Sequence, residues 1–261
     1  MNILEQIAAQ TRERIEAEKR QTPTEELIRQ IEATEQKKSK QSFYEALKKP
    51  GMSYICEVKK ASPSKGLIAS DFPYLDIARE YEAAGASAIS CLTEPFRFLG
   101  KDAYLQEIAA QVEIPVLRKD FTVDEYMIYQ ARLLGASAVL LICAILDDAQ
   151  LRAYRELAES LGMDALVEAH DETEVGRAAV SGARIIGVNN RDLKTFTVDI
   201  NNSARYRKMV PKEVAFVSES GIKTAEDIAK LLENGTDAVL IGETLMRSEN
   251  KKQALDELRG M

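Results

Sequence analysis

The feature that most constrains this chain is the alternation, after Pro50, of eight short apolar runs with amphipathic segments. The amphipathic segments are about ten to fifteen residues long, which is the pattern of repeated strand–helix–strand units. Several runs are apolar at every position, and this favours parallel strands buried on both faces. The runs span residues 54–58, 88–92, 116–117, 138–142, 165–167, 185–188, 214–217 and 238–241. The sequence therefore predicts eight parallel strands joined by helices.

A weak internal repeat supports this count. Gly85, Gly135, Gly182 and Gly235 each stand shortly before an apolar run. Glycine suits the left-handed conformation that ends a helix, so each glycine marks a helix-to-strand turn. A doubly wound open sheet would have similar turns, but about eight such units fit a closed barrel better. We predict an α/β fold, a (β/α)8 TIM barrel, in which residues 1–261 form a single domain.

The segment before the first run has a different character. Residues 2–50 contain no glycine, and their apolar residues lie in helical spacing. Residues 22–25 and 42–45 each carry the pattern of a helix N-terminus, with a capping Thr or Ser three residues before Glu. These features predict two or three helices, with a polar joint near 36–41. We expect residues 1–50 to form an N-terminal helical extension packed on the barrel.

Composition excludes several classes of partner. The chain has 35 Lys and Arg against 42 Asp and Glu, a formal net charge of -7, which repels nucleic acid unless a local basic patch overrides it. No stretch approaches the roughly 18 apolar residues of a membrane span, and residues 1–20 lack the apolar core of a secretory signal. We therefore expect a soluble cytoplasmic protein that binds neither nucleic acid nor membrane.

The cysteines and the single histidine bear on metal sites and on hydrolase chemistry. Cys56, Cys91 and Cys143 are far apart, so they form neither a disulfide framework nor a paired metal site, and we expect them to be buried and reduced. With one histidine, His170, and no GxSxG motif, a Ser-His-Asp hydrolase is disfavoured, and no metal site is expected. His170 is interpreted as a loop residue before a helix capped by Asp171.

Charged residues stand at the ends of several predicted strands. Catalytic groups of a barrel lie where each strand meets the loop that follows it. Each charge alone could be an ordinary surface residue, but several at strand ends favour convergence on one cavity, where a Lys beside a Glu can act as an acid–base pair. The candidates are Glu57, Lys59, Lys119, Glu168 and Glu219, with Asn189 and Arg191 after the sixth run.

Two glycine turns after the seventh and eighth runs predict a phosphate site. Barrels often bind phosphate there through backbone N–H groups and the start of a short helix. The turns are Ser218-Glu-Ser-Gly221 and Leu240-Ile-Gly242-Glu-Thr-Leu245, and the carboxylate of Glu243 would have to point away from a phosphate. Residues 62–66 could be a further anion-binding loop or a plain Pro–Gly turn. Phenylalanines near loop starts, Phe96, Phe98 and Phe121, could line an apolar pocket or pack in the core.

At these strand ends the chain resembles the indole-3-glycerol phosphate synthase family of tryptophan biosynthesis. The amino-terminal extension is similar as well. The matching segments cover the predicted barrel in order: Glu57-Val-Lys-Lys-Ala-Ser-Pro-Ser-Lys-Gly66, Leu92-Thr-Glu94 with Phe98, Pro115-Val-Leu-Arg-Lys-Asp-Phe121, Leu166-Val-Glu168, Gly187-Val-Asn-Asn-Arg-Asp-Leu193, Ser218-Glu-Ser-Gly-Ile222 and Leu240-Ile-Gly242. The first and third segments are specific to this family, whereas the last two recur in related phosphate-binding barrels.

The resemblance implies a reaction that needs no cofactor. The substrate, 1-(o-carboxyphenylamino)-1-deoxyribulose 5-phosphate, closes a ring and loses carbon dioxide and water to give indole-3-glycerol phosphate. By the match, Lys119 is the general acid at the substrate carbonyl and Glu168 is the general base. Lys59 pairs with the substrate carboxylate or assists acid catalysis.

The remaining site residues follow from the same match. Glu57, Asn189 and Glu219 hold the lysines and the substrate hydroxyls in place. Arg191 also belongs to the substrate-binding set. The phosphate goes to Ser62, Ser220, Gly221 and Gly242, and the aromatic ring goes to Phe98 and Phe121.

Two alternatives remain open from the sequence. One is another phosphate-binding barrel isomerase or synthase, such as a phosphoribosylanthranilate isomerase. The other is a non-catalytic sensor of a phosphorylated metabolite, which would not depend on Lys119 for its function. The expected partner in each case is a small phosphorylated molecule, and the resemblance is also compatible with association with other tryptophan-pathway enzymes.

Overall fold

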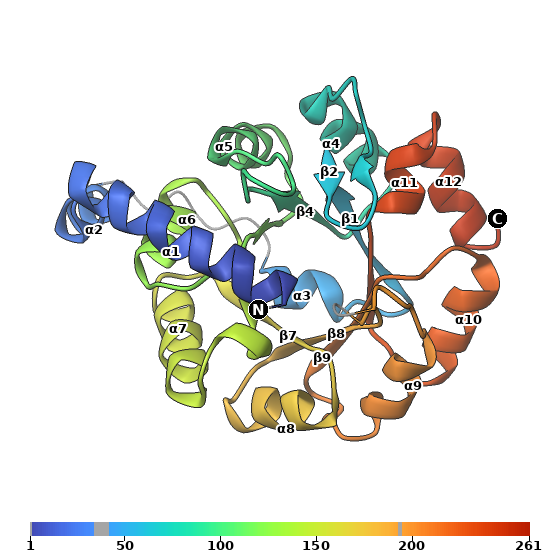
Figure 1. The fold of residues 1–261 in the computed structure, drawn as a ribbon. Coiled ribbons are helices and arrows are strands. Elements are labelled where there is room, and N and C mark those ends of the chain that lie inside the picture. The colour runs from blue at the N-terminus through green and yellow to red at the C-terminus, as the bar shows by residue number, and fades with distance from the viewer. Residues whose placement is uncertain (1, 34–41, 193–194) are drawn as a thin grey trace.

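The computed structural model describes residues 2–33, 42–192 and 195–261. Within these ranges, parallel strands close into a barrel that is surrounded by helices (Figure 1). The polar joint expected at 36–41, and Leu193 at the end of one quoted motif, lie outside the described residues. No helix of the described ranges is both long enough and apolar enough to cross a membrane.

The eight predicted strands are confirmed, and they form the barrel in sequence order. The first strand pairs in parallel with both the second and the last, which closes the sheet. The strands are β1 (Ser53–Val58), β4 (Ala88–Leu92), β5 (Val116–Lys119), β6 (Ala138–Ile142), β7 (Asp164–Ala169), β8 (Ile185–Asn189), β9 (Ala215–Glu219) and β10 (Ala238–Ile241).

Several strands run further than the apolar runs that predicted them. β5 continues to Lys119, β7 to Ala169, β8 to Asn189 and β9 to Glu219. The apolar runs stop at the first polar side chain, but the backbone stays in register, as in the pairing of Asn189 with Glu219. The expected site residues at these ends therefore belong to the strands, and the sheet fixes their positions.

Helices surround the barrel, and the four repeat glycines precede its strands. Gly85, Gly135, Gly182 and Gly235 have φ angles of 80°, 83°, 82° and 85°, so each occupies the left-handed conformation that the repeat predicts. The outer helices are α4 (Tyr74–Ala83), α5 (Asp102–Gln111), α6 (Tyr126–Leu133), α7 (Asp148–Ser160), α8 (Glu172–Val180), α9 (Asn201–Arg207), α10 (Ala225–Glu233), α11 (Glu243–Arg247) and α12 (Lys251–Leu258), with a short 3-10 helix η1 (Cys143–Ile145).

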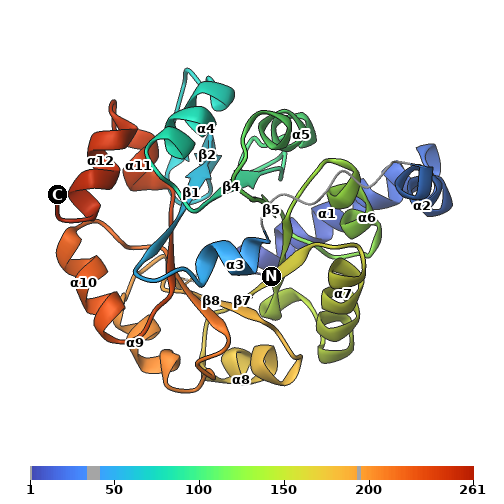
Figure 2. The ribbon, with the colours of Figure 1, turned by 180° about the vertical axis from the view of Figure 1, so that it is seen from behind.

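The amino-terminal segment contributes helices at both ends of the barrel. α1 (Ile3–Gln21) lies across one mouth, and α3 (Phe43–Leu47) lies at the other, as the two opposite views show (Figures 1 and 2). α2 (Thr24–Ala33) packs beside α6, away from the barrel axis. Phe43 and Leu47 are fully buried against the starts of the strands, so α3 closes that end.

The predicted helix start at residues 22–25 is wrong in detail. Thr22 ends α1, where its backbone N–H donates to Glu18 O, and α2 begins at Thr24. Pro23 lies immediately before this helix. At the second predicted start, Ser42 does cap α3, since its hydroxyl accepts a hydrogen bond of 3.3 Å from the backbone of Glu45.

The interior of the barrel is filled by layers of apolar side chains from alternate strands, as expected for this fold. One layer comes from the first, third, fifth and seventh strands around the barrel. Its members are Ile55, Leu117, Leu166 and Val217, all fully buried. Because side chains on a strand alternate between faces, the residues two positions further along these strands point to the same interior.

The described structure adds a small hairpin that the sequence analysis did not predict. β2 (Ala61–Ser62) and β3 (Gly66–Leu67) pair in antiparallel fashion after β1. Pro63, Ser64 and Lys65 form its turn, and Gly66 has a φ of 64°. Residues 62–66 therefore form a turn, and residues 62–65 also line the cavity described below.

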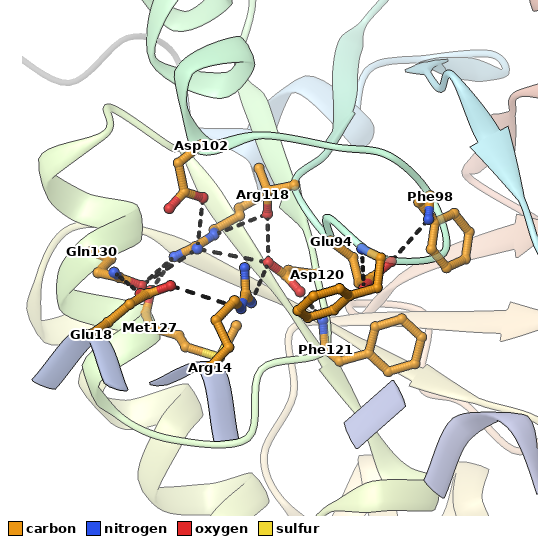
Figure 3. Close-up of polar contacts among 12 residues, drawn as sticks. Arg14, Glu18, Glu94, Phe98, Asp102, Arg118, Asp120, Phe121, Met127 and Gln130 are labelled. Atoms are coloured by element: carbon orange, nitrogen blue, oxygen red, sulfur yellow. Dashed lines mark hydrogen bonds and ion pairs between the residues drawn. The ribbon is translucent and has the colours of Figure 1, made fainter. Parts of the chain in front are cut away.

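A buried ionic network attaches α1 to the end of β5 (Figure 3). Arg14 donates to Asp120 Oδ2 at 3.0 Å, and Thr93 Oγ1 donates to the same oxygen at 2.7 Å. Arg118, which is buried below, donates to the backbone oxygen of Met127 at 2.8 Å and to Asp102 at 2.9 Å. The side chain of Asp120 is fully buried, so the hydrogen bonds from these partners offset the cost of removing it from water.

Replacing Arg14 with Met should lower the free energy of unfolding by roughly 2 kcal/mol, because a charged hydrogen bond to a buried carboxylate is lost. Urea unfolding followed by circular dichroism measures the change. Arg12, exposed on the same helix, provides the control, and Arg12→Met should alter stability by less than about 0.5 kcal/mol. Equal stability of the two variants would show that the contact with Asp120 does not hold α1.

Candidate active site

The carboxyl ends of the strands open into a cavity of about 770 Å³. Helix α1 contributes Ile3, Leu4 and Ile7 to its lining. All of the site residues expected from the sequence line this cavity: Glu57, Lys59, Ser62, Phe98, Lys119, Phe121, Glu168, Asn189, Arg191, Glu219, Ser220, Gly221 and Gly242. The structure thus brings together groups that are separated by up to 185 positions in the chain, the interval from Glu57 to Gly242 (242 − 57).

A layer of charged side chains forms the floor of the cavity. Glu57, Lys119, Glu168 and Glu219 stand on alternate strands, each two residues beyond a member of the apolar layer. They therefore take the interior positions where a barrel core normally continues with apolar side chains. Glu57, Glu168 and Glu219 are nearly fully buried.

The lysines and carboxylates of this layer pair with each other. Lys119 Nζ lies 3.0 Å from Glu168 Oε2 and 3.7 Å from Glu219 Oε2. Lys59 makes a close ion pair with Glu57. Asn189 Nδ2 donates to Glu168 Oε1 at 3.5 Å, a long contact. Each buried charge therefore has a partner, which is the condition for keeping charges out of water.

Burial and charge act in opposite directions on the pKa values of this cluster. Burial opposes the charged form of Lys119, but Glu168, Glu219 and Glu57 outweigh it and raise the pKa of the ammonium group. Burial also opposes ionisation of Glu168, yet Lys119 and His170 hold the pKa of its carboxyl well below the usual range. For Glu219, burial and the adjacent Glu168 carboxylate raise the pKa to about 8. These shifts favour a carboxylate on Glu168 and a proton on Glu219, beside the ammonium group of Lys119.

Two glycines make room for these side chains. At Gly187 a Cβ atom would overlap Glu219 Oε1, and at Gly242 it would overlap Glu57 Oε1 and lie 2.8 Å from Lys59 Nζ. Any side chain at these positions would displace the charged layer. The sequence suggested Gly242 as a phosphate-binding residue. The structure shows that it also leaves room for the side chains of Glu57 and Lys59.

The turn after β9 is formed by two residues with positive φ angles. Ser220 and Gly221 have φ angles of 68° and 87°, so two successive residues adopt the left-handed conformation. Asn190 supports the turn from below, because its Nδ2 donates to Ser218 Oγ at 2.9 Å and to the backbone oxygen of Ser220 at 3.0 Å. Its Oδ1 accepts from the hydroxyl of Ser203 at 2.9 Å. This arrangement leaves Ser220 and Gly221 lining the cavity.

Glu243, which opens α11 after Gly242, is held by basic side chains. Its Oε1 lies 3.4 Å from Lys65 Nζ, on the hairpin turn, and 3.2 Å from Arg247 Nε. Its carboxylate is thus neutralised by two cations at the rim. Because these cations also line the cavity, the expected conflict between Glu243 and a phosphate is relieved.

Part of the cavity wall is apolar. The rings of Phe98 and Phe121 have centroids 6.2 Å apart, and both line the cavity. The buried carboxylate of Glu94 fixes the loop that carries Phe98, since it accepts hydrogen bonds of 2.8, 2.7 and 2.9 Å from the backbone N–H groups of Phe96, Arg97 and Phe98 (Figure 3). Phe96 itself is 53% exposed and is not among the residues that line the cavity.

Sequence reasoning missed three residues that support the site. Glu94 and Asn190 hold the loops just described. Glu94 lies two residues after the end of β4 and Asn190 directly follows β8, and this closeness to a strand end is the signal that could have marked them. His170 was interpreted as a plain loop residue, but its ring is largely buried against Glu168. Within the described ranges, no group of three or more His, Cys, Asp or Glu side chains is arranged to hold a metal ion.

Comparisons with known proteins show the family of this chain. The family model described as "Indole-3-glycerol phosphate synthase" matches residues 4–258. The chain is 55% identical over 258 residues to the indole-3-glycerol phosphate synthase of Ruminiclostridium cellulolyticum, covering 99% of each chain. It is also 55% identical over 253 residues to that of Lacticaseibacillus paracasei, covering 97% of each.

Solved structures with low sequence identity share the barrel. A thiamine phosphate pyrophosphorylase from Pyrococcus furiosus superposes with a TM-score of 0.61 at 16% identity, covering 84% of this chain and 96% of that one. A mutant tryptophan synthase alpha-subunit from the same organism has a TM-score of 0.60 at 14% identity, covering 80% and 98%. These likenesses show the fold alone, whereas the family model and the relatives show that this chain belongs to the indole-3-glycerol phosphate synthase family.

Proposed function

We propose that this chain converts 1-(o-carboxyphenylamino)-1-deoxyribulose 5-phosphate into indole-3-glycerol phosphate, carbon dioxide and water. The observation that carries the proposal is the contact of Lys119 Nζ with Glu168 Oε2 at 3.0 Å inside the cavity. It pairs a proton donor with a carboxylate at one point of the floor. The substrate carries a carboxylate and a phosphate, so it needs fixed cations in a chain whose net charge is -7.

In the first part of the reaction, Lys119 donates a proton to the substrate carbonyl oxygen while the ring carbon that bears the carboxylate attacks the carbonyl carbon. The new carbon–carbon bond closes the five-membered ring, and loss of carbon dioxide restores the aromatic ring. Lys59 pairs with the carboxylate before it leaves. Glu57 keeps Lys59 in place through the ion pair between them.

In the second part, the hydroxyl formed from the carbonyl takes a proton from the ammonium group of Lys59, which assists acid catalysis, and leaves as water. Glu168 accepts the proton that is lost as the indole double bond forms, and its position beside Lys119 allows the two groups to act on neighbouring atoms. Asn189 and Glu219 hold the pair and the substrate hydroxyls. No cofactor takes part in these steps.

The rest of the cavity binds the parts of the substrate that do not react. The turn at Ser220 and Gly221, with Ser62 and Gly242, takes the phosphate, and Arg191 lies at the same rim. The rings of Phe98 and Phe121 hold the anthranilate ring. We place the protein in the cytoplasm, as a single-domain enzyme that acts on this small phosphorylated molecule.

Replacing Lys119 with Ala should lower kcat by about a hundredfold or more, the scale of a positioned general acid, while substrate still binds. Product formation can be followed by indole fluorescence against a low background, because the chain contains no Trp. Lys60→Ala is a matched control, since Lys60 does not line the cavity. Near-normal turnover of the Lys119 variant would refute its role and would favour a non-catalytic sensor.

Replacing Gly242 with Ala should lower kcat/KM by roughly 10- to 100-fold, because the new methyl group must displace Glu57 and Lys59. Both KM and kcat should change, since the phosphate turn and the charged layer meet at this residue. Gly176→Ala in α8 is the control: nothing lies within 4 Å of a Cβ at Gly176, so activity should stay at the wild-type level. A Gly242 variant with wild-type kinetics would contradict the packing described.

The raised pKa of Glu219 makes stability depend on pH. The folded protein keeps a proton on Glu219 up to about pH 8, whereas an unfolded glutamate releases it near 4.5. The contribution of this group is therefore present at low pH and lost as the pH rises through that window. The free energy of unfolding can be measured with urea at pH 5, 6.5 and 8. Because the side chain of Glu219→Gln cannot titrate, this variant should become more stable relative to wild type as the pH rises. A difference that is constant with pH would exclude a protonated Glu219.

A further inference from the structure

His170 lies behind the proposed general base and outside the cavity. It is the single histidine of the sequence, and it stands two residues beyond Glu168, just after the end of β7. Its ring is largely buried, but it is not among the residues that line the cavity. Any influence on the reaction must therefore pass through Glu168.

The ring of His170 lies between two carboxylates. Nδ1 is 3.0 Å from Glu174 Oε2, and the same oxygen accepts the backbone N–H of His170 at 2.8 Å. Nε2 is 3.3 Å from Glu168 Oε1, at ion-pair distance. Nε2 is buried and makes no hydrogen bond within the described residues. A positive charge on the ring can therefore interact at this side with the carboxylate of Glu168. Hydrogen bonds of catalytic groups are often long without substrate and tighten when substrate binds.

Glu174 is itself fixed by the start of α8. Its backbone N–H donates to Asp171 Oδ1 at 2.9 Å, which caps the helix. The first turn of α8 therefore holds Glu174, Glu174 holds one side of the imidazole, and the other side faces Glu168. This chain of contacts connects a rigid helix with the floor of the cavity.

The charges around His170 favour an imidazolium ion. Besides Glu168 on β7 and Glu174 on α8, the nearby titratable groups are Lys119 on β5 and Glu219 on β9, both in contact with Glu168, and the thiol of Cys143 on η1, 3.6 Å from the Glu174 carbonyl oxygen. Burial favours a neutral ring, but the two carboxylates outweigh it and raise the pKa of His170 to about 10. With Glu219 protonated, the positive charges of Lys59, Lys119 and His170 balance the negative charges of Glu57, Glu168 and Glu174.

We propose that His170 is a positioning residue: held as an imidazolium ion by Glu174, it fixes the Glu168 carboxylate against Lys119. The two oxygens of Glu168 are thereby held from opposite sides, Oε2 by Lys119 and Oε1 by His170. Without His170, Oε1 keeps only the long contact with Asn189. The carboxylate is then free to rotate away from the reacting carbon. This inference rests on the proposed role of Glu168.

The first test separates positioning from folding by kinetics. His170→Leu should lower kcat by roughly 10- to 50-fold, a part of what a positioned base contributes, with KM changed less than about threefold. The amide of His170→Gln can still donate toward Glu168, so the kcat of this variant should lie within about fivefold of the wild-type value. Val175→Ala, a change in the buried face of α8, is the control for stability and should keep wild-type kcat.

The second test reads the imidazole directly. Because the chain has one histidine, protein made with 15N-labelled histidine and no affinity tag gives a single imidazole signal. At pH 8, where a free histidine is neutral, both ring nitrogens of the wild-type protein should still be protonated. Glu174→Gln keeps an acceptor for Nδ1 but removes the charge, and it should lower the midpoint of the titration by about one pH unit or more.

The two tests distinguish a failure of this inference from a failure of the proposed function. A wild-type protein that produces no indole-3-glycerol phosphate would refute the proposed function. Normal wild-type turnover with a neutral imidazole at pH 8, or with His170→Leu at wild-type kcat, would overturn the role of His170 alone. Should His170→Leu fold poorly, the Gln variant and the labelled wild-type protein still decide the question.

Discussion

The rest of the structure depends on one feature of the barrel interior. At the carboxyl ends of the strands, a layer of charged side chains stands where the last apolar layer of the core would normally lie. Ile55, Leu117, Leu166 and Val217 fill the barrel below, and Glu57, Lys119, Glu168 and Glu219 follow them two residues later on the same strands. An isolated charge at such a depth would be expelled or neutralised, because its desolvation costs several kcal/mol. Lys119 within the layer and Lys59 just beyond β1 offset this cost by pairing with the carboxylates, and the closed sheet fixes the separations of the four groups. Removing one member leaves the others without compensation, so the layer acts as a unit.

The rest of the site follows from the need to accommodate and orient this layer. Gly187 lies on β8 and Gly242 directly follows β10, at points where a side chain would collide with Glu219 or with Glu57. Asn190 and Glu94 hold the adjoining loops by hydrogen bonds to backbone atoms, and neither needs to touch a substrate. Helix α1 covers the apolar part of the mouth and is attached to β5 through Arg14 and Asp120, next to Lys119 in the sequence. The extension is therefore joined to the strand that carries the proposed acid.

Much of the fold and of the candidate site could be predicted from the sequence. The features that could not be predicted depend on contacts or side-chain directions that leave no local pattern in the sequence. Apolar runs and the left-handed glycines are local signals, so the strands and the turns at Gly85 or Gly135 could be found directly. The site residues could be found because strand ends of a barrel converge. Contacts such as that of Arg14 with Asp120, 106 positions apart, leave no local pattern. His170 was misjudged because its significance depends on the direction of a side chain relative to Glu174 and Glu168. The hairpin of β2 and β3 is too short for a periodicity to appear.

The apolar barrel and the charged layer make separate contributions, and this explains why proteins with similar folds have different names. Structures that share only 14–16% of this chain's residues superpose on it with TM-scores near 0.6, so the apolar layers and helix packing tolerate almost complete replacement of the sequence. Fold alone therefore says little about chemistry. What distinguishes this chain is which strands end in ammonium groups and which in carboxylates, and how the proposed acid on the third strand is brought against the proposed base on the fifth. If His170 fixes that base from behind, then the outer helix α8 also belongs to the site, although none of its residues lines the cavity. Specificity in such a barrel is then set by the ring of helices as well as by the strands, because the helices decide how firmly each charged side chain is held.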